Sequence, residues 1–440
     1  MALLGYDLFL ARKSLRRNPG LTLLVVVGIA LGIAVSTTFA AVRHAFQTDP
    51  IPEKSSMLHS VRLDSWDPAA PHPDRVGVPP QVTYRDMVEI MKSKIPVRQS
   101  GMFKTNLYVF PADKAQNPFE EMARVCYRDF FAMFGAPFAY GGTWDEKADG
   151  GEPVVVLSEP MNQKLFGGVN SVGKTVRLRD RDFKVVGVLA KWMPNLRFYD
   201  LTQNYIGEPE NLYIPFGLLR PMELQLAGNN DGWGPNTGTG FEGYLASEST
   251  WIQMWVELPN AQAVAAYKSF LDAYATEQKK IGRFQRPLNN KVTPLLEYMA
   301  DREVTPRAVK SLFAVSLLFL AVCAVNLIGL LLGKFLARSG ETSVRRALGA
   351  SRKDVFLQHL VECQLVSAVG GVVGVLLALG ALSGINAWLK SQTGRGDLFA
   401  LDLPMLLVAL ALTAGAGLVS GLYPAWRACQ LAPAVHLRIG

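Results

Sequence analysis

Cysteine, histidine and charge within the long apolar runs are all scarce in this sequence. Its 440 residues include four cysteines and five histidines. Only Cys126 lies between residues 47 and 305, so that region can form no internal disulfide and must be held together by its own core. No H-E-x-x-H or G-x-S-x-G motif occurs, and we therefore expect no catalytic residues, no bound metal and no enzyme activity.

Charge is absent from four apolar runs, at residues 21–42, 311–333, 364–389 and 403–426. At about 1.5 Å per residue each run can cross a hydrocarbon core of about 30 Å. A charge in the middle of a run would cost about 3 kcal/mol for insertion. The sequence therefore predicts four transmembrane helices. The first run could instead be a cleaved signal peptide, but it exceeds the usual apolar core of about 7 to 15 residues, which favours an uncleaved anchor.

The positive charge is concentrated beside the apolar runs. Residues 47–305 hold 28 Lys or Arg against 31 Asp or Glu, whereas the rest of the chain holds 17 against 6. The excess lies in residues 1–20 and 334–355, which the positive-inside rule places in the cytoplasm with both termini, leaving the large region outside. We interpret the basic balance as contact with anionic membrane lipid and expect no nucleic-acid binding.

These patterns predict an α-helical membrane bundle of four helices plus a large extracytoplasmic α+β domain between the first and second helices. The predicted parts are an amphipathic cytoplasmic helix (1–18), the first span (19–44), the external domain (45–305), the second span (306–334), a cytoplasmic loop (335–355), the third span (356–390), a short outer loop (391–402), the fourth span (403–427) and a cytoplasmic tail (428–440).

The external region mixes strand and helix patterns. Strands are predicted at Val154–Leu157 and Phe183–Leu189, and helices at Tyr84–Lys94 and Ala261–Lys280. We expect two lobes, one inserted into the other. The Gly- and Asn-rich segment 228–243 is predicted to be a mobile surface loop, with Trp233 and Phe241 as candidate contacts for a partner or ligand.

Small residues recur at four-residue spacing inside the apolar runs, a pattern that lets membrane helices approach closely. Asn326 is the one strongly polar side chain of the second run, and we expect its amide to join two helices rather than to bind a substrate. The predicted packing pairs are Gly28 with Gly32, Gly370 with Gly374, Gly380 with Gly384, and Gly417 with Gly421.

Residues 168–175 (GVNSVGKT) match a nucleotide-binding P-loop literally. A functional P-loop follows a strand and opens a helix, whereas Thr175 begins the alternating sequence TVRLRDRDFKVVGVL, which predicts two strands joined by a turn at Arg179–Arg181. We interpret the match as a glycine turn before a β-hairpin. No cofactor is therefore expected on this chain.

The most specific motif is ETSVRRALGASRKD, residues 341–354. Its spacing predicts a short helix that stops at Gly349, followed by a second helix capped by Ser351 and Asp354. From the residues alone, this could be any basic hairpin beside a membrane.

The motif resembles the loop of the MacB/FtsX-like ABC transporter permeases (type VII, with LolC/LolE-like relatives), whose pattern is close to E-I-G-I-R-R-A-L-G-A. Thr342 and Ser343 replace the family's Ile-Gly. Residues 14–34, 171–189 and 421–428 resemble further family segments, and the arrangement of one helix, a large domain and three helices agrees.

The resemblance implies that the short helix docks on a dimeric ABC ATPase subunit through Glu341, Val344, Arg345, Arg346, Leu348 and Gly349. It also implies porter-like and sabre-like lobes outside, and a second permease copy or paralogue in a bacterial inner membrane. ATP and magnesium would be bound by the ATPase. A periplasmic adaptor and a TolC-like outer-membrane channel are further expected partners.

The function implied is that of a MacB-like permease subunit, which couples ATP hydrolysis in a separate ATPase to conformational work outside, for efflux of a drug, peptide or similar substrate. Two alternatives remain open: a LolC/LolE-like permease that extracts lipoproteins, and an FtsX-like regulator of a periplasmic hydrolase. The large external domain argues against the latter, because that group's domain is typically smaller.

Overall fold

The computed structural model describes residues 19–112, 117–234 and 238–430. The chain divides into two compact units: a helical unit, made of the residues up to Thr48 and from Thr305 onward, and an extramembrane domain, Asp49–Val304. Each unit is described by itself. The amphipathic helix predicted at 1–18 and most of the tail predicted at 428–440 lie outside the described residues.

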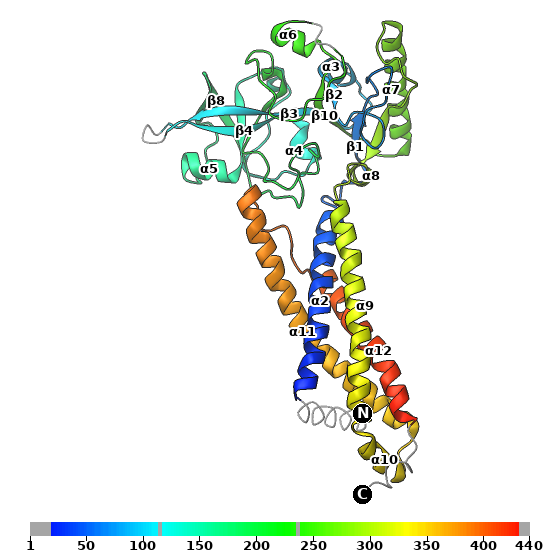
Figure 1. The fold of residues 1–440 in the computed structure, drawn as a ribbon. Helices are drawn as coiled ribbons and strands as arrows, with labels where there is room; N and C mark the ends of the chain where they lie inside the picture. The colour runs from blue at the N-terminus through cyan, green and yellow to red at the C-terminus, as the bar shows by residue number, and fades with distance from the viewer. Residues whose placement is uncertain (1–18, 113–116, 235–237, 431–440) are drawn as a thin grey trace. The chain divides into compact units, whose positions relative to one another are not determined.

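Within its described residues, the helical unit contains four helices that are long and apolar enough to cross a membrane (Figure 1). They cover the four predicted runs and lie in the predicted order, one before the large domain and three after it. A short fifth helix joins the second and third. The helices are α2 Pro19–Gln47, α9 Arg307–Leu336, α10 Ser339–Ala347, α11 Arg352–Thr393 and α12 Leu403–Cys429.

Local chemistry defines the ends of these helices. Proline is the first residue of α2, where a missing N–H costs nothing. At the start of α12, the Asp402 carboxylate accepts a hydrogen bond from the Met405 N–H. The same carboxylate lies 3.1 Å from Nε2 of His44. This contact joins the C-terminal part of α2 to the beginning of α12.

Six of the glycines predicted to pack lie at contacts between helices. A Cβ atom added at five of them would come closer than 3 Å to a neighbouring helix, so a larger residue at these positions would force a neighbouring group to move. The nearest atoms would belong to Leu327 for Gly28 (3.5 Å), Leu320 for Gly32 (2.7 Å), Ile29 for Gly370 (2.9 Å), Ala30 for Gly374 (2.8 Å), Ser367 for Gly417 (2.8 Å) and Cys363 for Gly421 (2.7 Å).

One glycine pair and the asparagine make no helix contact among the described residues of this chain. A Cβ atom at Gly380 or Gly384 would meet no atom within 4 Å, so this pair mediates no helix contact. Asn326 is exposed on α9, and its amide therefore joins no two helices of the chain. Sequence spacing places a residue on a helix, but it does not determine which side of that helix its neighbours occupy.

The extramembrane domain is built on an 11-stranded sheet with the order β11-β1-β10-β3-β4-β9-β6-β8-β5, while β2 pairs with β10, and β7 pairs with β3 and β8. The strands are β1 Leu58–Arg62, β2 Val82–Thr83, β3 Arg98–Phe110, β4 Phe119–Cys126, β5 Phe138–Gly141, β6 Val154–Leu157, β7 Thr175–Leu178, β8 Arg181–Leu189, β9 Leu212–Pro215, β10 Thr250–Glu257 and β11 Lys291–Pro294.

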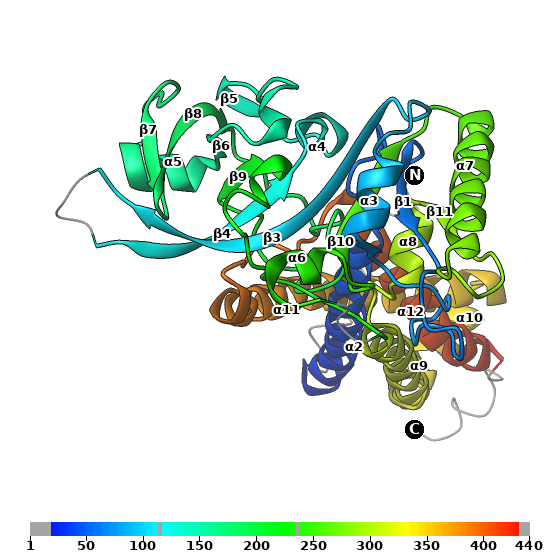
Figure 2. The ribbon, with the colours of Figure 1, turned by 90° about the horizontal axis from the view of Figure 1, so that it is seen from above.

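The long strand β3 belongs to both halves of this sheet. Its first part pairs with β10 and its second part with β4. Figure 2 shows β6, β8 and β5 on one side of the β3–β4 pair, and β1 and β11 on the other. The chain from β4 to β9 is thus inserted between β3 and β10, in agreement with the predicted α+β architecture. One buried core, with Val61 and Tyr267 in one half and Val155 and Phe183 in the other, extends through both.

Helices accompany both halves of the sheet. They are α3 Tyr84–Ile90, α4 Asp129–Met133, α5 Glu159–Phe166, α6 Gly240–Leu245, α7 Ala261–Lys280 and α8 Leu295–Asp301, with single 3-10 turns η1 Ala148–Gly150 and η2 Phe216–Leu218. The bounds of α7 and β6 agree with the prediction. Helix α3 ends four residues before the predicted Lys94.

Candidate functional site

The connection between α9 and α11 contains the motif singled out in the sequence. Helix α10 ends at Ala347, and Gly349 then adopts a φ of +107°, a backbone conformation that favours glycine. Ser351 opens α11: its hydroxyl accepts from the Asp354 N–H, and the Asp354 carboxylate accepts from the Ser351 N–H. The predicted short helix, glycine break and capped second helix are confirmed.

Helix α10 presents apolar side chains to solvent. Leu348, its C-cap residue, is 83% exposed, and Val344, one turn earlier, is 48% exposed. Thr342 and Ser343, which depart from the family pattern, are buried. Exposed leucine and valine on adjacent turns form a small apolar surface of the kind found where another molecule binds.

For the other residues predicted for this contact, the structure describes the side chain in some cases and only the backbone in others. The backbone of Glu341 and Arg345 belongs to α10, but their side chains lie outside the described part. Arg346 is half-buried, and its Nη1 donates to the Cys429 carbonyl of α12 at 3.4 Å. Arg346 thus ties α10 to the end of α12, a connection that the sequence did not indicate.

Buried charges adjoin α10, at the end of α9 and in the first turns of α11. Nζ of Lys334 lies 2.7 Å from Oε1 of Glu362, and both side chains are buried. Nη1 of Arg338, the N-cap residue of α10, is 3.6 Å from the same oxygen. His359 Nδ1 lies 4.0 Å from Oε2, and its ring packs on Phe335 with centroids 4.1 Å apart. Sequence reasoning missed this cluster.

A second buried cluster lies inside the extramembrane domain. Arg124 on β4 donates to Oδ2 of Asp200 at 2.9 Å and also to Glu210. Nζ of Lys104 on β3 is 3.2 Å from Asp200, and Nη1 of Arg197 is 3.2 Å from Glu210. All five side chains are buried. The cluster fastens the long segment 197–210 to the sheet.

The electrostatics of this cluster favour ionised carboxylates. Burial alone would raise the pKa of Asp200, but Arg124 and Lys104 hold that pKa well below its usual range. The pKa of Glu210 is also lowered, because Arg124 and Arg197 outweigh the effect of burial. Burial lowers the pKa of Lys104 and raises that of the fully buried Cys126 thiol on β4.

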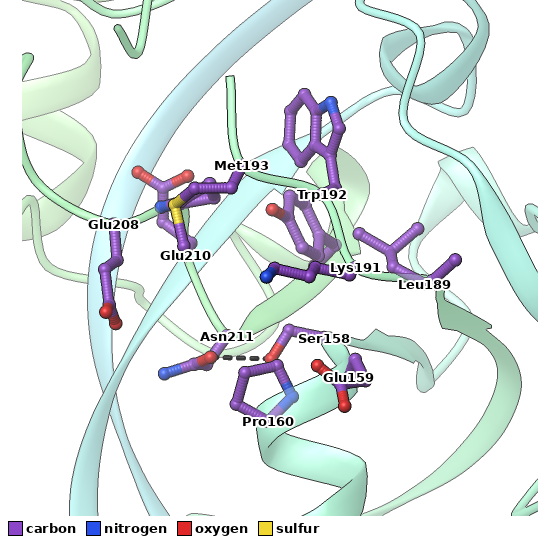
Figure 3. A pocket seen from close by; sticks show the side chains of 13 residues that line it. Ser158, Glu159, Pro160, Leu189, Lys191, Trp192, Met193, Glu208, Glu210 and Asn211 are labelled. Carbon is purple, nitrogen blue, oxygen red and sulfur yellow. Dashed lines mark hydrogen bonds between the residues drawn. The ribbon is translucent and has the colours of Figure 1, made fainter. Parts of the chain in front are cut away.

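A pocket of about 110 Å³ lies beside this cluster (Figure 3). Lys191, Trp192 and Met193 line it from one segment, and Glu159 and Pro160 line it from the beginning of α5. Its wall also includes buried Glu210 and buried Tyr213, whose hydroxyl has no hydrogen-bond partner among the described residues. Carboxylates and an ammonium group share the rim, so the lining favours no single ligand charge.

Two models of known protein families match this chain. Residues 22–274 match the model of the MacB-like periplasmic core domain, which is more than half of the chain. This chain belongs to the MacB/FtsX-like family of ABC transporter permeases. Residues 313–433, which include α10, α11 and most of α9, match the FtsX-like permease C-terminal domain.

Curated relatives of this MacB/FtsX-like permease include two proteins named macrolide export ATP-binding/permease protein MacB. The one from Rhodospirillum rubrum is 26% identical over 98% of this chain and 60% of its own length. The one from Syntrophobacter fumaroxidans is 26% identical over 69% of this chain and 45% of its own length. The chain therefore spans less than two thirds of the length of either relative.

Among solved structures, the periplasmic region of MacB from Actinobacillus actinomycetemcomitans is 15% identical and aligns with 56% of this chain and 92% of its own length. The TM-score is 0.35.

The P-loop-like residues of this permease form a turn, as interpreted from the sequence. Gly167 caps the end of α5, and Thr175 is the first residue of β7, which pairs with β8. Arg179, in the connecting turn, has a φ of +53°. Because a strand follows the motif, no helix N-terminus is available there for a phosphate. Among the described residues, no group of three or more His, Cys, Asp or Glu side chains could hold a metal.

The two aromatic residues proposed as external contacts occupy different environments. Trp233 is 37% exposed, and its Nε1 donates to the Ser65 carbonyl at 2.9 Å. Phe241, on α6, packs against the domain core. Trp233 therefore has the more accessible ring, and contact with a partner stays a prediction for both residues.

Proposed function

We propose that this chain is the permease subunit of an ABC exporter and couples ATP hydrolysis in a separate ATPase subunit to movement of its extramembrane domain. The ATPase would bind ATP and magnesium, while this chain would bind neither. Membership of the MacB/FtsX-like family supports the proposal, and the curated relatives are named as export proteins.

The observation that carries the proposal is the exposed apolar surface of α10. Leu348 and Val344 are exposed on a short helix held between two long apolar helices. The excess of Lys and Arg beside this segment supports a cytoplasmic position for it and for both termini, in a bacterial inner membrane. An ATPase docked there could move α9 and α11, because the connections between these helices are short.

The docking surface can be tested by replacing Arg345 and Leu348 together with Glu in the full-length chain. We expect the double variant to lose co-purification with an ABC ATPase, because it removes an apolar contact and reverses a charge. A matched control is the Lys280→Glu, Ile281→Glu variant, which changes an exposed basic and an exposed apolar residue at the end of α7. Normal ATPase binding by the α10 variant would contradict the assignment.

Proteins that co-purify with the wild-type chain test the kind of work performed. A periplasmic adaptor and a TolC-like channel would support efflux of a drug or peptide, the function proposed here. Enrichment of acylated lipoproteins would instead indicate a LolC/LolE-like permease, and a cell-wall hydrolase would indicate an FtsX-like regulator. A second permease copy or paralogue is expected in each case, and absence of any ATPase would contradict all three.

A further inference from the structure

The cluster around Glu362 connects three helices at the point where the chain enters α10. Lys334 lies in the last turn of α9, Arg338 is the N-cap residue of α10, and Glu362 lies on α11. One carboxylate oxygen, Oε1 of Glu362, is within ion-pair distance of both cations. The contacts therefore span the junction between α9 and α10 from a single point on the third helix.

The junction between α9 and α10 is short, and its backbone is hydrogen-bonded to α9: the Ala337 N–H donates to the Gly333 carbonyl at 3.0 Å, and the Arg338 N–H donates to the Phe335 carbonyl at 3.1 Å. Only Ala337 and Arg338 separate the last residue of α9 from the first residue of α10. Arg338 leaves the helical conformation, with φ −108° and ψ 12°, and caps α10 with no side-chain hydrogen bond. The Arg338–Glu362 ion pair adds a contact from α11 to this turn, so a third helix also bears on the direction of α10 relative to α9.

Stability alone is a weak reason for burying these charges. Taking an ammonium and a carboxylate out of water is unfavourable for each ion, and replacing a buried pair with neutral groups is often neutral or stabilising. Ionisable side chains buried between membrane helices are likewise uncommon and frequently functional. A buried pair does, however, specify one arrangement, because any other arrangement leaves a charge without its partner.

The two contacts of Glu362 also differ in closeness. The Lys334 contact is 2.7 Å and joins two buried side chains, whereas the Arg338 contact is 3.6 Å and involves a side chain that is 15% exposed. The first fastens α9 to α11. The second is longer and more accessible to water, so it can change when α10 moves without separating the two long helices.

From this geometry we infer that Glu362 is a positioning residue for coupling, which holds α10 at a defined angle and passes its displacement to α9. Lys334 is the fixed partner of Glu362, and Arg338 is the adjustable one. His359, packed on Phe335 one turn away, restricts the place of the carboxylate. The inference rests on the proposed function, since it presumes that an ATPase displaces α10.

Hydrogen exchange in the full-length complex with its co-purified ATPase can test this role. The probe is a non-hydrolysable ATP analogue. In the wild type we expect the analogue to change exchange in α10 and also in the last two turns of α9. The change in α10 reports the docked ATPase, and the change in α9 reports transmission across the junction, so the two steps have separate readouts.

Two variants separate positioning from folding. Lys334→Met with Glu362→Gln leaves no unpaired charge of that pair, and Arg338→Gln keeps the Lys334–Glu362 contact intact. We expect both variants to assemble and to keep the analogue-dependent change in α10, but to lose the change in α9. Lys353→Gln, an exposed cation of the same region, is the matched control and should behave as wild type.

The outcomes distinguish the inference from the proposed function. No analogue-dependent change in α10 of the wild-type complex would overturn the proposed function, and with it the inference. A change that reaches α9 in the Arg338→Gln variant as fully as in wild type would overturn the inference alone. If the double variant does not assemble, the Arg338→Gln result decides.

Discussion

The two units of this permease each bury a group of charges, but they place the group differently. In the extramembrane domain, Arg124, Asp200 and Glu210 lie between the sheet and a long crossing segment, surrounded by the domain core. In the helical unit, Lys334 and Glu362 lie near the ends of the apolar runs, beside a junction between helices. The first group stabilises one fold, whereas the second lies where two helices can change their angle.

The units also differ in what holds the rest of each together. The extramembrane domain has a large apolar core with many aromatic contacts, such as Phe130 against Tyr199 and Phe134 against Trp255. The helical unit depends on close backbone approach at glycines, because hydrocarbon solvent provides no hydrophobic force between helices. Removing a buried charge should therefore reduce stability most in the extramembrane domain. Enlarging a side chain should reduce it most in the helical unit.

Removing Arg124 should have the largest effect. Arg124→Met leaves the Asp200 and Glu210 carboxylates buried without their main partner, and we expect the free energy of unfolding of the domain to fall by about 3–5 kcal/mol. Urea unfolding of the full-length chain, followed by the fluorescence of buried Trp251 and Trp255, measures this loss.

The control for that experiment is Arg220→Met. Arg220 pairs with Glu242 at 3.1 Å on the surface, and more than half of each side chain is exposed. Its loss should change the free energy of unfolding by no more than about 1 kcal/mol. Equal effects of the two substitutions would mean that the buried cluster does not organise the domain.

Enlarging a packing glycine should have the next largest effect. In Gly374→Leu the new side chain would meet the Ala30 carbonyl and Ile33 of α2, and we expect a cost of about 1–3 kcal/mol in the stability of the helical unit. Gly380→Leu, on the same helix but with open space around it, is the control and should be close to neutral. Denaturation in mixed micelles, followed by helical circular dichroism, compares the two, and matching losses would refute the close contact.

Acidification should have the smallest effect on the stability of the extramembrane domain, when the change is counted per pH unit. The folded-state pKa values of Asp200 and Glu210 lie below their unfolded values of about 4, so the stabilisation is present above pH ~4 and is lost as the pH falls through the folded-state values. Each carboxyl contributes up to about 1.4 kcal/mol per pH unit. Thermal unfolding of the domain from about pH 5 to about pH 2 measures how its stability depends on pH. A stability that does not change over this range would exclude ionised carboxylates in the cluster.

Local sequence determined what could be predicted of the fold. The four membrane helices follow from runs without charge, and the break after α10 follows from Gly349 and the Ser351–Asp354 cap. The β7–β8 hairpin follows from alternation on either side of Arg179. Each of these features depends on neighbours within a few residues, which is the range over which sequence patterns carry information.

Features that depend on distant partners could not be predicted. Arg124 donates to carboxylates 76 and 86 residues away, and a lone arginine in a strand gives no sign of burial. Lys334 and Glu362 stand at the edges of apolar runs, which was the one available signal for their pairing. Asn326 shows the same limit, because helical spacing alone did not reveal that its side of α9 is exposed.

The single cysteine of the extramembrane domain has a practical consequence. Cys126 is fully buried at the end of β4, and burial raises the pKa of its thiol, so little of the reactive thiolate is available to reagents. A cysteine introduced anywhere on the surface of that domain would therefore be the one fast-labelling thiol there. Fluorophores or cross-linkers could be attached to the domain at chosen sites without first removing its native cysteine.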